Sequence, residues 1–532
     1  MAFAAAGHAD ELSDIQAQSK QLREQNQAMT KRLADLEKRQ KAIEAKPVAS
    51  TINPVDAMAA DLPYKAAVKA KAPESDDMCW HGICLYGNFD MGLAYEQHGT
   101  PFNSMAGGPL NYAVEKASNG SYFGVGANQM STSFIGLRGK QEVADNLYAV
   151  FNLQTLFNPA SGAGVNQIGG IAQNNGLGAN VNTLQWANSY GDSSKAGVMF
   201  NNVAYFGISS PTYGTFTMGR QSALTSDLVV NYDALSGATA FSMITFEGAT
   251  GGQGFTEDRI FDNSYEYRLN VGPVRLAAIA QLRNGGNSAT GNAFQGDVGF
   301  DYMGLSMDFV AGRVYDGNGI ATTLSAAQMQ QINASGIGCS LGCVGSVIAD
   351  TTTFAVAAKY VIGPWKFYGG YEHIQYTNPD NPLAGVNQGT MAFMMGGYNI
   401  AFPTNNFFGT DKVLQSFWVG AKYAITPNLD VMGSYYGYRQ NSFVSPAGNP
   451  LGNCTTSISP ACSGAMDAVS VAMDWRFARH FDFYAGVMYS QKSGGLANGY
   501  VLTATNLLNP ATVNTFNRVS NYDPAVGLRY QF

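Results

Sequence analysis

Side chains that could do chemistry gather in one stretch without a regular pattern, residues 221–258. It contains five carboxylates: Asp227, Asp233, Glu247, Glu257 and Asp258. The runs on either side, 214–221 and 259–270, alternate apolar and polar residues as β-strands do. Connections of this length without structure of their own are usually functional. If the flanking strands belong to a wide barrel, we expect this stretch to fold inward and narrow it.

The histidines do not indicate an enzyme. None of them has the spaced Ser/Asp partners or metal ligands that convergent catalytic chemistry needs: His8, His81, His98, His373 and His480. We therefore expect no catalytic residue, no metal and no cofactor. The acids of 221–258 have two other interpretations, a place on the outer surface or a calcium site.

The composition excludes several classes of protein. Charged residues make up 13% of the chain, about half of the usual ~25%, yet the mean hydropathy is only −0.10. No run of about 18 apolar residues exists, which excludes transmembrane helices but not transmembrane β-strands. The net charge of −7 and the lack of a basic face argue against nucleic acid.

From Cys84 onward the sequence alternates with a period of two. Sixteen such runs begin near residues 84, 132, 147, 202, 214, 259, 273, 295, 305, 351, 364, 413, 428, 466, 481 and 522. Their connections alternate between short turns, such as 270–273 and 425–428, and long loops, such as 157–201 and 316–350. Short turns on one rim and long loops on the other are typical of outer-membrane β-barrels.

A soluble all-β array or β-helix is the alternative, and the polar face argues against it. Its side chains would each cost several kcal/mol in a buried core but stay hydrated in a lumen: Asp90, Asn152, Gln154, Asp262, Glu266, Arg268, Gln281, Asp297, Lys359, Asp474, Arg476 and Arg529. About sixteen strands also enclose an aqueous channel rather than a packed core. We predict a 16-stranded antiparallel transmembrane β-barrel over 80–532, with both ends on the periplasmic, short-turn rim.

Three segments precede the barrel. Residues 1–11 are a tail, either a signal-peptide remnant or simply the start of the chain. Residues 12–46 show coiled-coil spacing, with core positions Leu12, Ile15, Leu22, Asn26, Met29, Leu33, Leu36 and Ile43. A lone solvated helix is the alternative to this coiled coil. Residues 47–79 are an Ala-, Pro- and Lys-rich linker, which we interpret as a spacer.

The six cysteines form three local pairs, Cys79–Cys84, Cys339–Cys343 and Cys454–Cys462. Each pair lies between periodic runs, in a segment with Gly, Ser or Pro. Disulfides formed in an oxidising compartment are the favoured interpretation. Free thiols or metal ligands are the alternative, although no histidine near Cys339 supports a zinc site.

Five short motifs follow one another along 80–532. They are Gly136-Leu-Arg-Gly139, Ala204-Tyr-Phe-Gly-Ile-Ser209, Tyr213-Gly-Thr-Phe-Thr-Met-Gly-Arg-Gln221, Asn263-Ser264 and Val526-Gly-Leu-Arg-Tyr-Gln-Phe532. Together they resemble the trimeric general diffusion porins of Gram-negative proteobacteria. The resemblance implies a homotrimeric outer-membrane channel for passive diffusion of ions and small hydrophilic solutes, surrounded by lipid and lipopolysaccharide. It also implies that Phe532 is the terminal aromatic read by the outer-membrane assembly machinery.

The resemblance further implies that acids on the inward third loop face basic residues on the wall. The loop candidates are Asp227, Asp233 and Glu247, and the wall candidates are Phe134, Arg138, Lys140, Asn202, Asp262, Glu266 and Arg268. Arg138 keeps an arginine of the family pattern, whereas Phe134, Asn202 and Glu266 stand where the pattern has arginines. Fewer cations and one more anion predict weak or cation-leaning selectivity.

Two other interpretations stay open. Wall cations such as Lys140 and Arg268 could serve only to balance neighbouring carboxylates. The chain could also be a substrate-selective channel that tethers the outer membrane to peptidoglycan through its N-terminal coiled coil.

Overall fold

A computed structural model describes the chain in separate ranges. These are 78–97, 121–160, 199–245, 259–282, 292–321, 343–380, 393–395, 398–405, 410–442, 463–494 and 518–532, with single residues at 20, 31, 162 and 164. The chain divides into two compact units, Met1–Ala57 and Met58–Phe532. The first is described only at Lys20 and Lys31, both helical and exposed. The predicted coiled-coil core therefore lies outside the described residues and stays a prediction.

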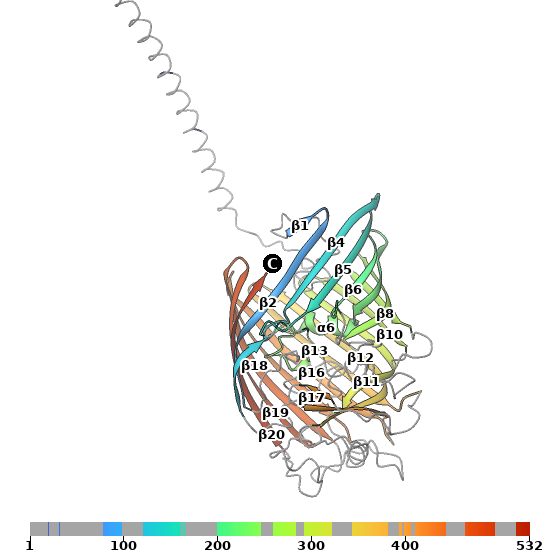
Figure 1. Cartoon of the computed structure of the whole chain (residues 1–532), viewed down its shortest axis with the longest axis vertical. Helices are drawn as coiled ribbons and strands as arrows, with labels where there is room; N and C mark the ends of the chain where they lie inside the picture. Colours follow the sequence, from blue (N-terminus) through green and yellow to red (C-terminus); the bar gives the residue numbers. More distant parts are fainter. Residues whose placement is uncertain are drawn as a thin grey trace, which may run out of the picture. The chain divides into compact units, whose positions relative to one another are not determined.

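The second unit is built on a closed ring of antiparallel β-strands (Figure 1). Its strands are β2 Ile83–Glu96, β3 Tyr122–Ala127, β4 Phe134–Ala144, β5 Leu147–Leu156, β6 Ala204–Ser210, β7 Gly214–Ser222, β8 Ile260–Val271, β9 Val274–Gln281, β10 Ala293–Tyr302, β11 Leu305–Ala321, β12 Cys343–Ile362, β13 Trp365–Thr377, β16 Lys412–Thr426, β17 Leu429–Gln440, β18 Gly464–Ala478, β19 Phe481–Gly494 and β20 Arg518–Gln531. The ring closes where β20 pairs with β2, from Asn88↔Gln531 to Ala94↔Ala525.

Within the described ranges the ring has sixteen positions, because β3 and β4 share one. Both pair with β2, β3 along Met91–Glu96 and β4 along Ile83–Asn88. The predicted 16-stranded antiparallel barrel is therefore confirmed. Each predicted run corresponds to one ring position.

The short connections between ring strands are also confirmed. The turn between β10 and β11 has only Met303 and Gly304, at φ +46° and +83°. Two consecutive positive φ values match the backbone twist of antiparallel strands, and glycine adopts them without steric cost.

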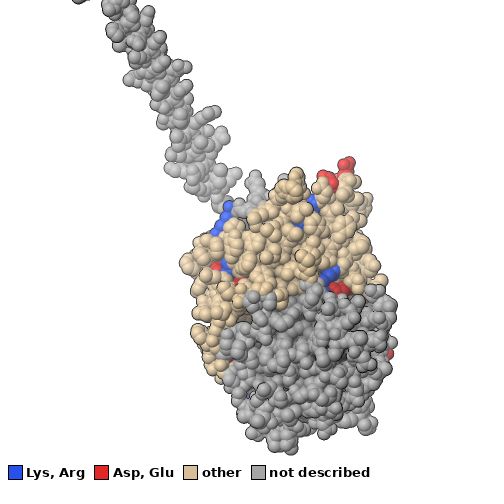
Figure 2. Space-filling view, viewed as in Figure 1, with Lys and Arg blue, Asp and Glu red and all other residues tan. Residues whose placement is uncertain are grey.

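Side chains along the ring strands alternate between an exposed apolar face and a buried face. On β16, for example, Val419 is 59% exposed and its neighbour Trp418 is 2% exposed. Exposed aromatics stand beside the short turns, as Tyr302, Trp365 and Phe481 do. Others recur about eight residues further along their strands: Phe294, Phe354, Tyr371 and Tyr489. At about 3.3 Å per residue and about 40° of tilt, these two belts bound an apolar zone about 20 Å high. Among the described residues on the face visible in Figure 2, charged side chains are sparse.

The prediction that the inward polar side chains are exposed to solvent in the lumen is wrong for several residues, which are buried instead. Asp90, Gln154 and Glu266 are at most 2% exposed. The reason is that inward side chains on adjacent strands reach one another. Gln154, for example, donates to the Tyr86 hydroxyl at 2.6 Å. Polar contacts within the wall thus replace water for these groups.

Three strands outside the ring were not predicted. β1 Met78–Trp80 pairs with the start of β2, and the predicted Cys79–Cys84 disulfide links these strands. β14 Phe393–Met395 pairs with β15 Tyr398–Asn405, which runs parallel to β12. The other two predicted disulfides fall wholly or partly outside the described residues.

A further unpredicted feature, this one within the ring, is the break between β3 and β4. Asn128 there has φ +61°, and the Asp90 carboxylate accepts the N–H groups of Met130 and Ser131 at 2.8 and 2.6 Å. Buried Asp90 thus satisfies backbone donors that have left the sheet.

The stretch 221–258 has structure of its own, contrary to expectation. It contains helix α6, Leu224–Tyr232, and a short 3₁₀ turn η1, Met243–Thr245. α6 contacts β9 to β13, and in Figure 1 it is drawn among the ring strands. No helix in the described ranges is long and apolar enough to cross a membrane.

Candidate functional site

The segment 223–245 is held at its start by the Gln295 side chain of β10 and by the backbone carbonyl of Arg259. The backbone N–H groups of Leu224 and Thr225 donate to Gln295 Oε1 at 2.7 and 3.4 Å, and the Ala223 N–H donates to Arg259 O at 2.8 Å. These contacts satisfy donors that a helix start leaves open. α6 then buries Leu224, Leu228 and Val229, so the helix is seated by apolar packing as well.

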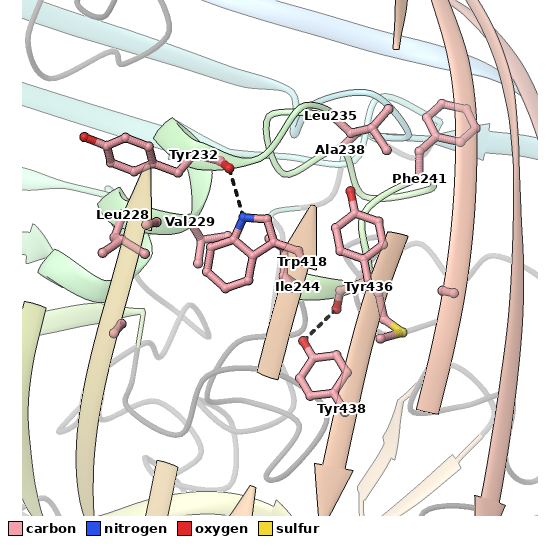
Figure 3. Packing of buried hydrophobic residues seen from close by; sticks show 14 of the residues in the cluster. Leu228, Val229, Tyr232, Leu235, Ala238, Phe241, Ile244, Trp418, Tyr436 and Tyr438 are labelled. Atoms are coloured by element: carbon pink, nitrogen blue, oxygen red, sulfur yellow. Dashed lines mark hydrogen bonds between the residues drawn. The ribbon is translucent and has the colours of Figure 1, made fainter. Parts of the chain in front are cut away.

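Tyr232, the last residue of α6, joins the segment to two parts of the wall. Its hydroxyl donates to Asp308 Oδ2 on β11 at 2.8 Å, and Arg275 donates to the hydroxyl oxygen at 3.0 Å. Its carbonyl accepts from Trp418 Nε1 on β16 at 2.9 Å (Figure 3). Burial raises the pKa of the Tyr232 phenol far above its usual value, so this group acts as a neutral donor.

The residues that follow α6 contact side chains of β17 and β19. Asp233 Oδ1 accepts from the Tyr436 hydroxyl at 2.8 Å, and Tyr438 donates to the Met243 carbonyl at 3.2 Å (Figure 3). Phe241 packs edge-on against Tyr484, with ring centroids 6.3 Å apart. Tyr232, Tyr436, Tyr438, Tyr484 and Phe241 are among the largest fully buried side chains. A layer of aromatic rings therefore joins the segment to the sheet.

Glycines on the wall make room for these contacts. A Cβ on Gly420 would lie 2.8 Å from the Ala234 methyl, and one on Gly486 would lie 2.9 Å from the Phe241 ring. Gly299 on β10 lies opposite Arg275 on one neighbouring strand and opposite Asp308 on the other. Because Gly299 has no side chain, Arg275 reaches across it to Asp308 at 2.5 Å.

Three arginines beside the segment are ion-paired with carboxylates. Arg268 pairs with Asp227 of α6 and with Glu266 on its own strand. Arg275 pairs with Asp301 and Asp308. Arg220 pairs with Asp262 at 2.5 Å. In these described clusters three guanidinium groups meet five carboxyl groups, so their formal charge is −2 when all are ionised.

The predicted site residues are only partly brought together. Asp227, Glu266 and Arg268 form one cluster, and Asp262 lies in the neighbouring pair with Arg220. Asp233 instead is fully buried and contacts no basic side chain among the described residues. Burial raises the pKa of its carboxyl. Glu247 lies outside the described residues.

The remaining wall candidates lie on β4 or just before β6, in contact with side chains of β2 and β5. Phe134 packs edge-on against Tyr86, with centroids 5.4 Å apart, and the Arg138 guanidinium lies over the same ring at 4.6 Å. Tyr86 donates to Asn152 at 2.5 Å. Asn202 donates to Gln154 at 2.5 Å, and Lys140 lies over the Tyr148 ring at 4.2 Å. Two candidate cations are thus placed over aromatic rings.

Sequence reasoning considered Arg275 only as a wall cation that could balance neighbouring carboxylates. It did not select the other residues that seat the segment: Asp301, Asp308, Trp418, Tyr436 and Tyr438. No local signal in the sequence showed that these residues meet the segment. Phe532 was predicted as a terminal signal. It stacks on Phe89 and Tyr530, and its N–H donates to Gly87 O at 3.1 Å.

Within the described ranges, no three His, Cys, Asp or Glu side chains form a group that could hold a metal ion.

Solved structures include several similar folds. The anion-selective porin from Comamonas acidovorans is 16% identical, with a TM-score of 0.52 over 85% of this chain and 99% of that one. OmpT of Vibrio cholerae is 13% identical, with a TM-score of 0.48 over 86% of this chain and 100% of that one. At such identities the likeness concerns the fold alone. No curated protein matches the chain.

The sequence as a whole matches one family model. That model describes Gram-negative porins, and the match spans residues 57–495, which is most of the barrel and of the chain. The chain belongs to the Gram-negative porin family.

Proposed function

We propose that this chain forms a water-filled channel through the outer membrane, by which ions and small hydrophilic solutes diffuse passively. The family and the closed ring of sixteen positions support a channel. The alternation of an apolar exposed face with a polar buried face fits hydrocarbon outside and solvent inside.

The segment 223–245 is the proposed constriction, and this is the observation that carries the proposal. Its contacts run from β9–β13 to β19 and to Gln129 at the break between β3 and β4, which accepts the Ala240 N–H at 2.8 Å. These strands lie far apart around the ring. A segment this short meets all of them from within the lumen, where paths between strands are short.

The charges beside the segment favour cations. Each of the three arginines is already paired, and the clusters carry two more carboxyl than guanidinium groups. A negative potential at a narrow, low-dielectric site concentrates cations. We therefore propose a weak preference for cations. The Comamonas porin is described as anion-selective, but this chain's own residues point the other way.

Solute entry into liposomes tests the channel itself. Liposomes containing the protein should swell in small sugars, whereas protein-free liposomes should not. Reversal potentials in a KCl gradient test the selectivity. A clear preference for chloride would refute the cation preference without refuting the channel.

We also propose a homotrimer whose N-terminal segment lies in the periplasm. An even number of strands brings both ends of the barrel to the short-turn rim, and the predicted coiled coil at 12–46 would suit a trimer. Removal of residues 1–75 tests attachment to the cell wall separately from the channel. Conductance should persist, and any attachment to peptidoglycan should be lost in a pull-down with purified sacculi.

A further inference from the structure

Asp233 is an ionisable group in a neutral, fully buried setting. It is 0% exposed and follows α6 directly. Its carboxyl accepts hydrogen bonds from the Tyr436 hydroxyl at 2.8 Å, the Gly237 N–H at 3.0 Å and the Ser434 hydroxyl at 3.5 Å. The Ser242 hydroxyl and the Leu235 N–H also act electrostatically to lower the pKa of this carboxyl. Every one of these donors is uncharged.

The elements around Asp233 bring no compensating charge. From its own segment come Leu235, Gly237 and Ser242, and from β17 come Ser434 and Tyr436. β16 contributes Trp418 and Gly420, which contact the adjacent Tyr232 and Ala234. Tyr436 is the only titratable side chain among these described contacts besides Asp233 itself. The charged Arg275 cluster binds the Tyr232 hydroxyl instead.

We propose that Asp233 is a proton-controlled latch that holds the constriction segment on β17 and releases it when the carboxyl loses its proton. The proposal rests on the channel function above. Asp227 has no such role, because Arg268 compensates its charge.

The sign follows from burial. Desolvation raises the pKa of Asp233 above its usual 3.8, and the hydrogen bonds oppose this only in part. A raised pKa in the docked state means that docking is most stable below the ordinary pKa. That stability is lost as the pH rises towards the raised value. Above the raised value the docking free energy levels off.

Release has a defined consequence for the current. The wall lies behind the segment, since Phe241 and Ala234 rest against Gly486 and Gly420. A segment that leaves the wall can therefore move only into the lumen. Each release should appear as a partial closure of the channel, and closures should become more frequent at higher pH.

Single-channel recording at symmetrical KCl concentrations, from about pH 3 to about pH 8, tests the latch. For the unmodified protein, the frequency of partial closures should rise up to tenfold per pH unit and then level off. Asp233→Asn should show a frequency independent of pH. Tyr436→Phe removes one donor to the ionised form, so the rise should extend about one pH unit higher.

The matched control is Asp145→Asn, an exposed carboxyl in the β4–β5 turn, which should keep the full pH response. An Asp233→Asn channel that still titrates, or a Tyr436→Phe channel with an unshifted plateau, would overturn the latch. A folded protein that gives no current at all would instead overturn the channel function, so the two failures are distinguishable.

Discussion

Replacement of Asp227 by asparagine should weaken the preference for cations. Asp227 is the carboxylate of α6 that pairs with Arg268. Glu266 remains beside Arg268 in the variant, so the guanidinium keeps a partner and the wall should keep its geometry. The formal charge of the three described clusters would change from −2 to −1.

Coulomb's law gives the size of the effect. An ion passing about 7 Å from one unit charge in water gains or loses about 0.6 kcal/mol, which is a factor of about 2.7 in local concentration. Cations and anions respond oppositely, so their ratio changes about sevenfold without salt. Screening in about 0.1 M salt halves the energy and leaves about a threefold change.

The assay is the reversal potential in a KCl gradient for purified protein in planar bilayers. Asp227→Asn should lower the potassium-to-chloride permeability ratio about threefold near 0.1 M salt, and less at higher salt. The control is Glu142→Gln, which removes the same charge from an exposed position near the β4–β5 turn. Equal shifts in both variants, or no shift in Asp227→Asn, would refute the reasoning that the clusters set the selectivity.

Three other changes test the packing. Gly420→Ala places a methyl group against Ala234 and the Ser434 hydroxyl. We expect the docking of the segment 223–245 on the wall to lose about 1–3 kcal/mol, so partial closures should be more frequent at every pH. An unchanged current trace would contradict the packing of this segment against β16. Arg529→Gln leaves Asp482 and Asp474 without their shared arginine, which should lower the free energy of unfolding by about 3 kcal/mol or more. Arg439→Gln at an exposed pair should lower it by about 1 kcal/mol or less. Urea titration compares the two variants, and equal losses would contradict a stabilising role of the buried network. Joint replacement of Cys79 and Cys84 by alanine should release β1 from β2 and lower the stability of this strand pair by about 2 kcal/mol. Amide exchange at 78–80 should become faster, and the conductance should stay unchanged. A changed conductance would place β1 and the start of β2 in the pore.

The strands were predictable because their signal is local. Alternation with a period of two is written into each run, and short turns such as Met303-Gly304 fix where runs end. The break between β3 and β4 was not predictable in this way, since it depends on Asp90 bonding to Met130 and Ser131 some forty residues later.

Helix α6 was missed for a different physical reason. Leu224, Leu228, Val229 and Tyr232 are all buried, as are Thr225 and Asn231, so burial is spread around the helix rather than confined to one stripe. A helix without an exposed polar face gives no amphipathic pattern.

The charge clusters needed the register of the strands. Arg275 meets Asp308 two strands away only because Gly299 lies between them. Asp233, predicted as a constriction acid from the family resemblance, is sequestered by Tyr436 on a strand about two hundred residues later. Such partners depend on the closed ring, which no single stretch of sequence encodes.

The central claim is that the barrel encloses a solvent-filled passage and presents an apolar outer face. The current through single molecules of the purified protein in a planar bilayer tests this claim most directly. We predict discrete conductance steps that are nearly ohmic at low voltage and grow in proportion to the bulk salt conductivity. Protein with intact β-sheet circular dichroism that inserts into the bilayer and yields no such steps would contradict the account.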